Sequence, residues 1–182
     1  IVLRHYEIGA AERAAKVSSV PIINAGDGAG QHPTQALLDL YTVQRECGRI
    51  EGMRIVLLGD LKNGRTVRSL SYLLSKFKNI KIYFVSPEAL KIGEDIKNHL
   101  KEHKIEYTEF EKMEPVLDQV DVIYQTRIQK ERFEDLGEYE KFKDAFIINK
   151  DIVSKMNPKA IIMHPLPRVN EISTEVDEMP NA

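Results

Sequence analysis

Residues 54–66 read RIVLLGDLKNGRT, and this stretch decides the fold. Residues 54–58 form an apolar run of strand length, which predicts a buried β-strand. The polar turn that follows contains two glycines and leads into a predicted helix near residues 65–77. A buried strand, a turn and a helix in this order are the repeating unit of a parallel sheet.

The same alternation continues on both sides of this stretch. Toward the C-terminus we predict strands at 80–85, 105–110, 122–125 and 160–163, and helices at 87–103 and 114–119. Toward the N-terminus we predict strands at 1–3 and 21–23, a glycine-rich turn at 24–30, and helices at 9–17 and 33–47. The last helix has an apolar stripe of Leu37, Leu38 and Tyr41 and should stop at Gly48. Together these elements predict an α/β fold with parallel sheets flanked by helices.

The composition limits the class of protein. The chain has 182 residues, 42% of them hydrophobic, so it can bury a core without disulfide bonds. Its 26 Lys and Arg residues balance 28 Asp and Glu residues, which argues against a nucleic-acid partner. The single Cys47 cannot form an internal disulfide and is typical of a reducing compartment, here the cytoplasm. No apolar run reaches about 18 residues, so no membrane partner is expected.

A ligand site is expected beyond the carboxyl ends of the strands. In parallel sheets this is where loops lead into helix N-termini and where ligands gather. The loops after residues 4, 24, 58, 125 and 163 are the relevant ones, and each carries an arginine or a histidine: Arg4, His32, Arg65, Arg127 and His164.

The sequence GDGAGQHPTQ at residues 26–35 combines a glycine-rich turn with a helix start, which is a natural anion site. His32 would stand at the positive end of the helix dipole, where a neutral imidazole can donate a hydrogen bond to a carbonyl oxygen. Gln35 lies one turn later on nearly the same face, and its amide can both donate and accept. The alternative is a capping turn with a solvent-exposed histidine.

Two loops carry pairs of candidate binding residues. Lys62 and Arg65 suggest a carboxylate or phosphate partner, which Arg65 could bind in a bidentate manner. Arg127 and Gln129 share one side of an extended segment, a spacing suited to one small anion. The alternatives are a solvated turn in the first case and a charged loop with local ion pairs in the second.

The HPLPRV segment at residues 164–169 is stiffened by two prolines. Proline fixes its own φ and favours an extended residue before it, so the carbonyl groups here should point in set directions and accept from an amide. The alternative is a rigid turn without a ligand. No zinc-site or nucleophile-elbow pattern is present. His99 and His103 are interpreted as part of a solvated helix face, with a weak metal pair as the alternative, and the acidic residues 131–140 as surface.

Seven segments carry a family resemblance. They read LRH (3–5), NAGDG (24–28), QHPTQ (31–35), GDLK (59–62), GRTV (64–67), TRIQKER (126–132) and HPLPRV (164–169). In this order, and over nearly the whole chain, they resemble the catalytic chains of the aspartate carbamoyltransferases. The ornithine branch would show a cysteine in the last segment. In many relatives an aromatic residue stands at the position of Asn63.

The resemblance implies transfer of a carbamoyl group from carbamoyl phosphate to the amino group of L-aspartate, an early step of pyrimidine synthesis. It implies that Arg4 and His32 donate to the carbonyl oxygen and that Arg4 also neutralises the phosphate. Gln35 and the backbone carbonyls of Leu166 and Pro167 would hold the carbamoyl NH₂ group. His32, Arg4 and Gln35 are thus the catalytic candidates.

For the second substrate, the resemblance implies that Arg65, Arg127 and Gln129 bind the two carboxylates of aspartate. No metal and no organic cofactor is implied. The alternatives are an ornithine-type or other carbamoyltransferase and a non-catalytic scaffold subunit of the same family.

The resemblance also implies two Rossmann-like domains of the aspartate/ornithine carbamoyltransferase fold. Residues 1–49 would be the latter part of an incomplete carbamoyl-phosphate domain with the connecting helix, and residues 50–182 the aspartate domain without its C-terminal helix. The family's earlier S-T-x-T-R phosphate motif is not in this sequence, so we expect these 182 residues alone to be inactive. A homotrimer with shared active sites is implied, with regulatory chains or fused pyrimidine enzymes as further partners.

Overall fold

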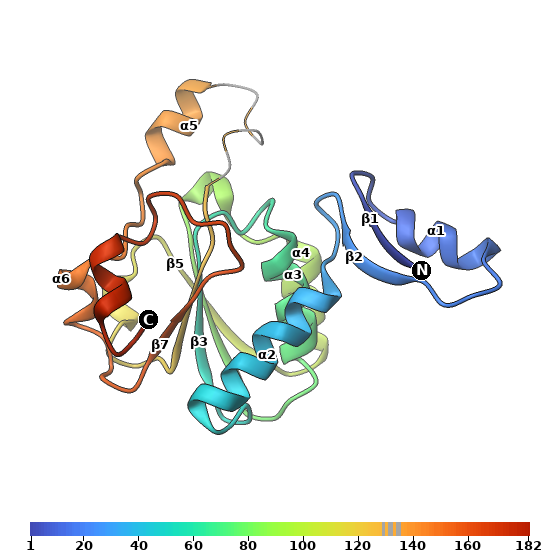
Figure 1. Cartoon of the computed structure of the whole chain (residues 1–182). Coiled ribbons are helices and arrows are strands. Elements are labelled where there is room, and N and C mark those ends of the chain that lie inside the picture. The colour runs from blue at the N-terminus through green and yellow to red at the C-terminus, as the bar shows by residue number, and fades with distance from the viewer. Residues whose placement is uncertain (129, 131–132, 134–135) are drawn as a thin grey trace.

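The computed structural model describes residues 1–128, 130, 133 and 136–182, and its centre is a five-stranded parallel sheet. The strand order is β5-β4-β3-β6-β7. Their bounds are Arg54–Leu58 for β3, Lys81–Val85 for β4, Glu106–Phe110 for β5, Val122–Gln125 for β6 and Ile161–Met163 for β7. The apolar run that decides the fold therefore forms the central strand (Figure 1).

The register of this sheet places the ends of its strands together. Leu58, the last residue of β3, pairs with Val85 of β4 and with Gln125 of β6. Because the strands are parallel, the loops that follow β3, β6 and β7 emerge at one edge.

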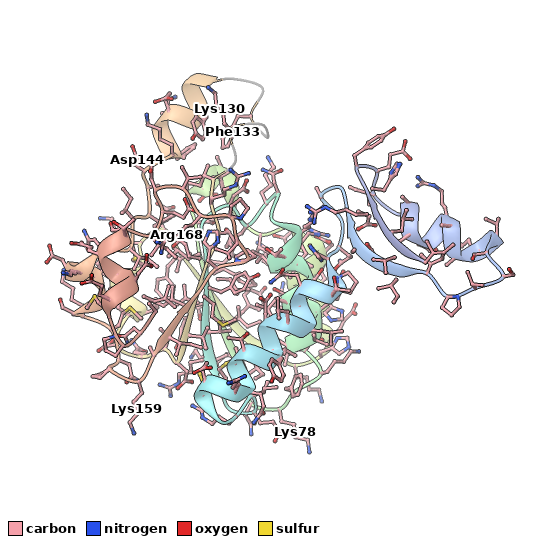
Figure 2. All side chains as sticks on the ribbon, in the orientation of Figure 1. Lys78, Lys130, Phe133, Asp144, Lys159 and Arg168 are labelled. Carbon is pink, nitrogen blue, oxygen red and sulfur yellow. The ribbon has the colours of Figure 1, made fainter. Side chains whose placement is uncertain are left out.

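Helices cover both faces of the sheet, as Figures 1 and 2 show. The helices on one face are α2 (Pro33–Cys47), α3 (Arg65–Leu74) and α4 (Glu94–Glu102), which pack on the β3 residues Ile55 and Leu57. The elements on the other face are η2 (Glu114–Val116), α6 (Lys150–Val153) and η4 (Thr174–Glu178), which pack on Val56 and Leu58. Since successive strand residues point to opposite faces, one apolar run supplies both cores.

A smaller unit lies beside the main sheet. The strands β1 (Val2–His5) and β2 (Ile23–Asp27) pair in parallel, and α1 (Ala10–Val17) joins them. In Figure 1 this unit stands to one side, and the chain passes from it into α2. The α/β fold class with parallel sheets and flanking helices is confirmed.

Three details of the prediction are wrong. The strand predicted at 21–23 lies at Ile23–Asp27, because pairing with β1 extends it into the predicted glycine turn. The helix predicted at 87–103 is divided into η1 (Glu88–Leu90) and α4, since the Leu90 carbonyl accepts the backbone N–H groups of Leu61 and Lys62 instead of continuing a helix. The helix predicted at 114–119 is the single 3₁₀ turn η2.

The buried face of α2 also differs from the predicted one. Leu37, Leu38 and Tyr41 are 61%, 55% and 62% exposed. The residues that face the sheet and α3 are Ala36, Asp39, Leu40 and Val43. The predicted end is correct, because α2 stops at Gly48 in the left-handed conformation, with φ 71°. The helices α5 (Leu136–Phe142) and α6 were not predicted, and α5 begins in the segment 131–140 that was interpreted only as acidic surface.

Candidate active site

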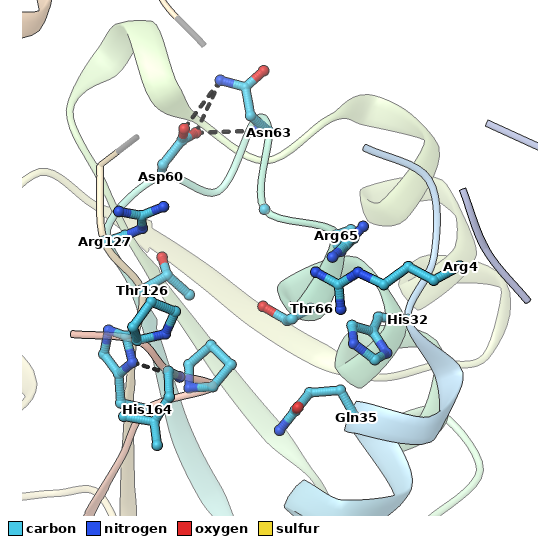
Figure 3. A pocket seen from close by; sticks show the side chains of 14 residues that line it. Arg4, His32, Gln35, Asp60, Asn63, Arg65, Thr66, Thr126, Arg127 and His164 are labelled. Carbon is cyan, nitrogen blue, oxygen red and sulfur yellow. Dashed lines mark hydrogen bonds between the residues drawn. The ribbon is translucent and has the colours of Figure 1, made fainter. Parts of the chain in front are cut away.

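A pocket of about 280 Å³ lies at the carboxyl ends of β3, β6 and β7. It is lined by Arg4, His32, Gln35, Asp60, Asn63, Gly64, Arg65, Thr66, Thr126, Arg127, His164, Pro165, Leu166 and Pro167. Figure 3 shows Arg4, Arg65 and His32 on one side, with Arg127, Thr126 and His164 opposite them. The structure therefore brings together, in one pocket, Arg4, His32, Gln35, Arg65, Arg127, Leu166 and Pro167 from the sequence-predicted site. Lys62 does not line this pocket, and Gln129 lies outside the described residues.

His32 precedes α2 and is held by its backbone. Its N–H donates to Ser69 Oγ of α3 at 2.7 Å, and that hydroxyl donates to Gln31 Oε1 at 2.6 Å. The ring atom Nδ1 lies 3.2 Å from Thr34 Oγ1, so with Thr34 as donor the ring proton is on Nε2. Burial lowers the pKa of His32, and the Arg65 and Arg4 guanidinium groups lower it further. The direction of this shift agrees with the predicted neutral imidazole, and burial is its largest cause.

Arg65 begins α3 and lies against the chain that follows β2. Its Nη1 donates to the Gly28 carbonyl at 3.1 Å. A Cβ atom at Gly26, where φ is 117°, would lie 3.0 Å from Arg65 Cζ. Glycine at position 26 therefore lets the guanidinium approach the backbone. Lys62, the other predicted cation of this loop, is exposed and is not among the residues that line the pocket.

The turn after β3 is shaped by Asp60, which is 2% exposed. Its Oδ1 accepts the Asn63 backbone N–H at 3.0 Å, and both carboxylate oxygens accept from the Asn63 side-chain amide at 3.2 and 3.1 Å. At Gly59, with φ 115°, a Cβ atom would lie 2.2 Å from the Thr126 carbonyl oxygen, so the two loops touch through backbone. Sequence reasoning missed Asp60 and Asn63 as lining residues, although both lie in a loop that it selected.

The loop after β6 continues the sheet by one residue. Thr126 donates to the Leu58 carbonyl through its N–H at 2.8 Å and through its hydroxyl at 3.0 Å. This anchoring places the next residue, Arg127, in the pocket opposite Arg65 (Figure 3).

The loop after β7 is fixed by a buried histidine. His164 Nδ1 accepts the Leu166 N–H at 2.8 Å, and its Nε2 lies 2.8 Å from Glu171 Oε1. Burial raises the pKa of Glu171, but the adjoining His164 ring and the hydrogen bond from the Val169 N–H outweigh it, and the pKa is lowered. The prediction that Leu166 is extended is wrong: its φ is 55°, because the bond to His164 turns the backbone back. Arg168 points elsewhere and pairs with Asp177 (Figure 2).

His99 and His103 lie at the C-terminal end of α4 and do not line this pocket. His99 is half-buried, contacts the Tyr72 ring and lies 2.8 Å from Ser75 Oγ, so its interpretation as part of a solvated face is wrong. Among the described residues, His99, Glu102 and His103 are the side chains grouped closely enough to suit a metal ion.

Two family models match the chain. Residues 51–182 match the Asp/Orn binding domain of aspartate/ornithine carbamoyltransferase, and residues 1–45 match its carbamoyl-P binding domain. The chain belongs to the aspartate/ornithine carbamoyltransferase family.

Relatives within the family are named for aspartate. The chain is 56% identical to aspartate carbamoyltransferase 2, chloroplastic, of Pisum sativum over 183 positions, which cover 100% of this chain and 48% of the relative. It therefore spans about half the length of that relative. No helix among the described residues is long and apolar enough to cross a membrane.

Solved structures agree with this assignment. The catalytic subunit of M. jannaschii aspartate transcarbamoylase is similar with a TM-score of 0.90 and 55% identity, covering 100% of this chain and 59% of that one. The Trypanosoma cruzi enzyme in complex with carbamoyl phosphate and aspartate is similar with a TM-score of 0.88 and 38% identity, covering 100% and 58%.

Proposed function

We propose that this chain contributes the pocket in which a carbamoyl group passes from carbamoyl phosphate to L-aspartate. The observation that carries the proposal is that His32, whose pKa is lowered, lies on the same side of the pocket as Arg4 and Arg65, with Arg127 facing them. Such a set of donors and cations suits a small, multiply charged anion with a reactive carbonyl. The relatives named above act on, or are bound to, the same pair of substrates.

The reaction needs stabilisation of an oxyanion. The amine of aspartate attacks the carbonyl carbon, a C–N bond forms, and the carbonyl oxygen becomes negative in a tetrahedral intermediate. His32 and Arg4 donate to that oxygen, and preorganised donors of this kind are typically worth about 3 kcal/mol each. The C–O bond to phosphate then breaks, and the leaving phosphate takes the proton from the amine.

The remaining roles follow from donor and acceptor types. Gln35 and the carbonyls of Leu166 and Pro167 accept from the carbamoyl NH₂ group, since they line the pocket and can supply acceptors. Arg65 and Arg127 bind the carboxylates of aspartate, for which two guanidinium groups are a natural match. Gln129 is proposed as a third aspartate ligand from its place in the sequence alone.

We further propose that residues 1–49 belong to a carbamoyl-phosphate domain and residues 50–182 to an aspartate domain. Two separate sheets and the two matched ranges support this division. Assembly into a trimer with shared active sites remains a proposal from family resemblance. So does location in the cytoplasm, and the pea relative is named as chloroplastic.

The test is a steady-state assay of the full-length protein that contains this chain, with N-carbamoyl-aspartate as the measured product. We expect Arg127→Gln to raise the KM for aspartate at least tenfold, because a charged hydrogen bond is worth about 1.5–3 kcal/mol. Arg68→Gln is the matched control, since Arg68 pairs with Asp95 outside the pocket.

Three results would contradict the proposal. Turnover of L-ornithine in preference to L-aspartate would assign the other branch of the family. Absence of product, together with no binding of a phosphonate–dicarboxylate bisubstrate mimic, would assign a scaffold. Equal effects of the Arg127 and Arg68 substitutions would remove Arg127 from the site.

A further inference from the structure

A buried carboxylate is bonded to one of the residues that line the pocket. Asp39 follows Gln35 by one turn of α2 and is 3% exposed. It does not line the pocket, whereas Gln35 does. A charged residue buried on a helix face that packs against a sheet is unusual unless its oxygens are bonded.

Both oxygens of this carboxylate accept hydrogen bonds. Gln35 Nε2 donates to Oδ1 at 2.9 Å, and the Tyr124 hydroxyl donates to Oδ2 at 2.9 Å. Tyr124 is fully buried on β6, so it fixes the carboxylate from the sheet side. The three side chains therefore form a short network from the sheet to the floor of the pocket.

This network decides which end of the Gln35 amide the ligand meets. An ionised carboxylate can only accept, so the amide end that faces Asp39 must be the NH₂ group. The carbonyl oxygen, Oε1, is then left on the pocket side. An amide without such a partner could present either end, because the two ends have nearly the same shape.

We propose that Asp39 is a positioning residue that turns Gln35 Oε1 toward the pocket and so selects acyl phosphates that carry an N–H donor. This inference rests on the proposed function, since it refines how that pocket distinguishes a carbamoyl from an acetyl group. Both groups have the same size and the same carbonyl, but a methyl group cannot donate to Oε1. A fixed acceptor therefore favours the carbamoyl group, and a freely turning amide favours it less.

The test compares carbamoyl phosphate with acetyl phosphate in the full-length protein. Asp39→Leu removes the acceptor and fills the same apolar space, and Tyr124→Phe is the matched control because it removes the other bond of the carboxylate and leaves Gln35 held. We expect Asp39→Leu to lower kcat/KM for carbamoyl phosphate about 10- to 100-fold, and for acetyl phosphate less than about threefold, as for one lost polar interaction. Tyr124→Phe should keep the ratio of the two substrates within about threefold.

If Asp39→Leu lowers kcat/KM by the same factor for both substrates, so that their ratio is unchanged, the proposal is overturned, since general damage to the fold lowers both.

A second measurement needs no turnover and no variant. In ¹H–¹⁵N spectra of the full-length protein, the two Gln35 side-chain protons should be widely separated and protected from exchange, because one is bonded to Asp39. Coincident, rapidly exchanging signals would refute the network even if the transferase activity is found. If the activity is absent and the signals are as expected, the proposed function fails and the positioning of Gln35 stands.

Discussion

The buried Asp39 carboxyl should make the protein less stable as pH rises from 4 to 7, and Asp39→Asn should remove this effect. Burial raises the pKa of Asp39 to about 6 in the folded chain, from a reference value of 3.8, although the bonds from Gln35 and Tyr124 oppose the shift. Below pH 3.8 the carboxyl is neutral in both states and no penalty exists. Between 3.8 and 6 the folded state binds more protons than the unfolded state, so stability falls as pH rises.

The magnitude follows from the size of the shift. A difference of about two pKa units corresponds to roughly 3 kcal/mol, since one unit is about 1.4 kcal/mol. The full penalty is therefore present above pH 6. In a protein whose total stability is about 5–15 kcal/mol, this is a large fraction.

The assay is urea unfolding of the wild type and of Asp39→Asn at several pH values from 4 to 7.5. Other groups also titrate in this range, but they are common to both proteins and cancel in the difference. The free energy of unfolding of the wild type minus that of Asp39→Asn should become more negative by about 3 kcal/mol from the lowest to the highest pH. A difference that stays flat, or that rises with pH, would refute the reasoning, and a carbon-detected titration of the Asp39 carboxyl should give a midpoint near 6.

Two further predictions concern the loops around the pocket. Glu171→Gln should destabilise the protein by about 1–3 kcal/mol at pH 7 and by less at pH 4. Because the pKa of Glu171 is lowered in the folded chain, the stability that its carboxylate contributes is lost as pH falls. Urea unfolding at both pH values measures this, and an equal loss of stability at both would contradict it. Gly59→Ala should lower the free energy of unfolding by more than about 2 kcal/mol, because its Cβ would overlap the Thr126 carbonyl oxygen. Gly48→Ala, at φ 71° with open space around it, should lower it by about 1 kcal/mol. Similar melting temperatures for the two variants would refute the role of the close contact.

The central sheet could be predicted because its strands are apolar on both faces. The run at residues 54–58 has no polar position between Ile55 and Leu58, and only a strand covered by helices on both sides can bury it. Arg4, His32 and Arg127 were predictable for a related reason. Arg4 is the next-to-last residue of β1, His32 comes a short turn after β2, and Arg127 comes two residues after β6, so all three lie near the carboxyl end of a parallel strand, where ligands gather.

The face of α2 could not be predicted, because two stripes with helical spacing compete. Leu37, Leu38 and Tyr41 are the more apolar stripe, but the buried one contains Asp39. Leu40 and Val43 of the buried stripe join the core of the main sheet, and Asp39 is bonded there to the Tyr124 hydroxyl, a partner 85 positions away that no local pattern reveals. Tertiary contacts here override local hydrophobicity.

The lining residues that the prediction missed contribute through turn geometry. Asp60 holds the Asn63 amide, and Thr126 doubles its bond to Leu58. Small polar residues in loops have many possible partners, so their type and spacing alone do not indicate which one they bind.

The hydrogen bonds around Ser69 have a consequence for how the two parts of the molecule act on each other. Gly9 and Gln31 donate their N–H groups to the Asp27 carboxylate, and Ser69 Oγ joins Gln31 to the backbone of His32. These hydrogen bonds thus form a continuous chain from the start of α1 to α3, and none of them uses a side chain that lines the pocket. The Ser69 hydroxyl connects the smaller sheet's part of this chain of hydrogen bonds to α3. Ser69→Ala would therefore weaken the contact between the two parts of the molecule without changing any side chain that lines the pocket.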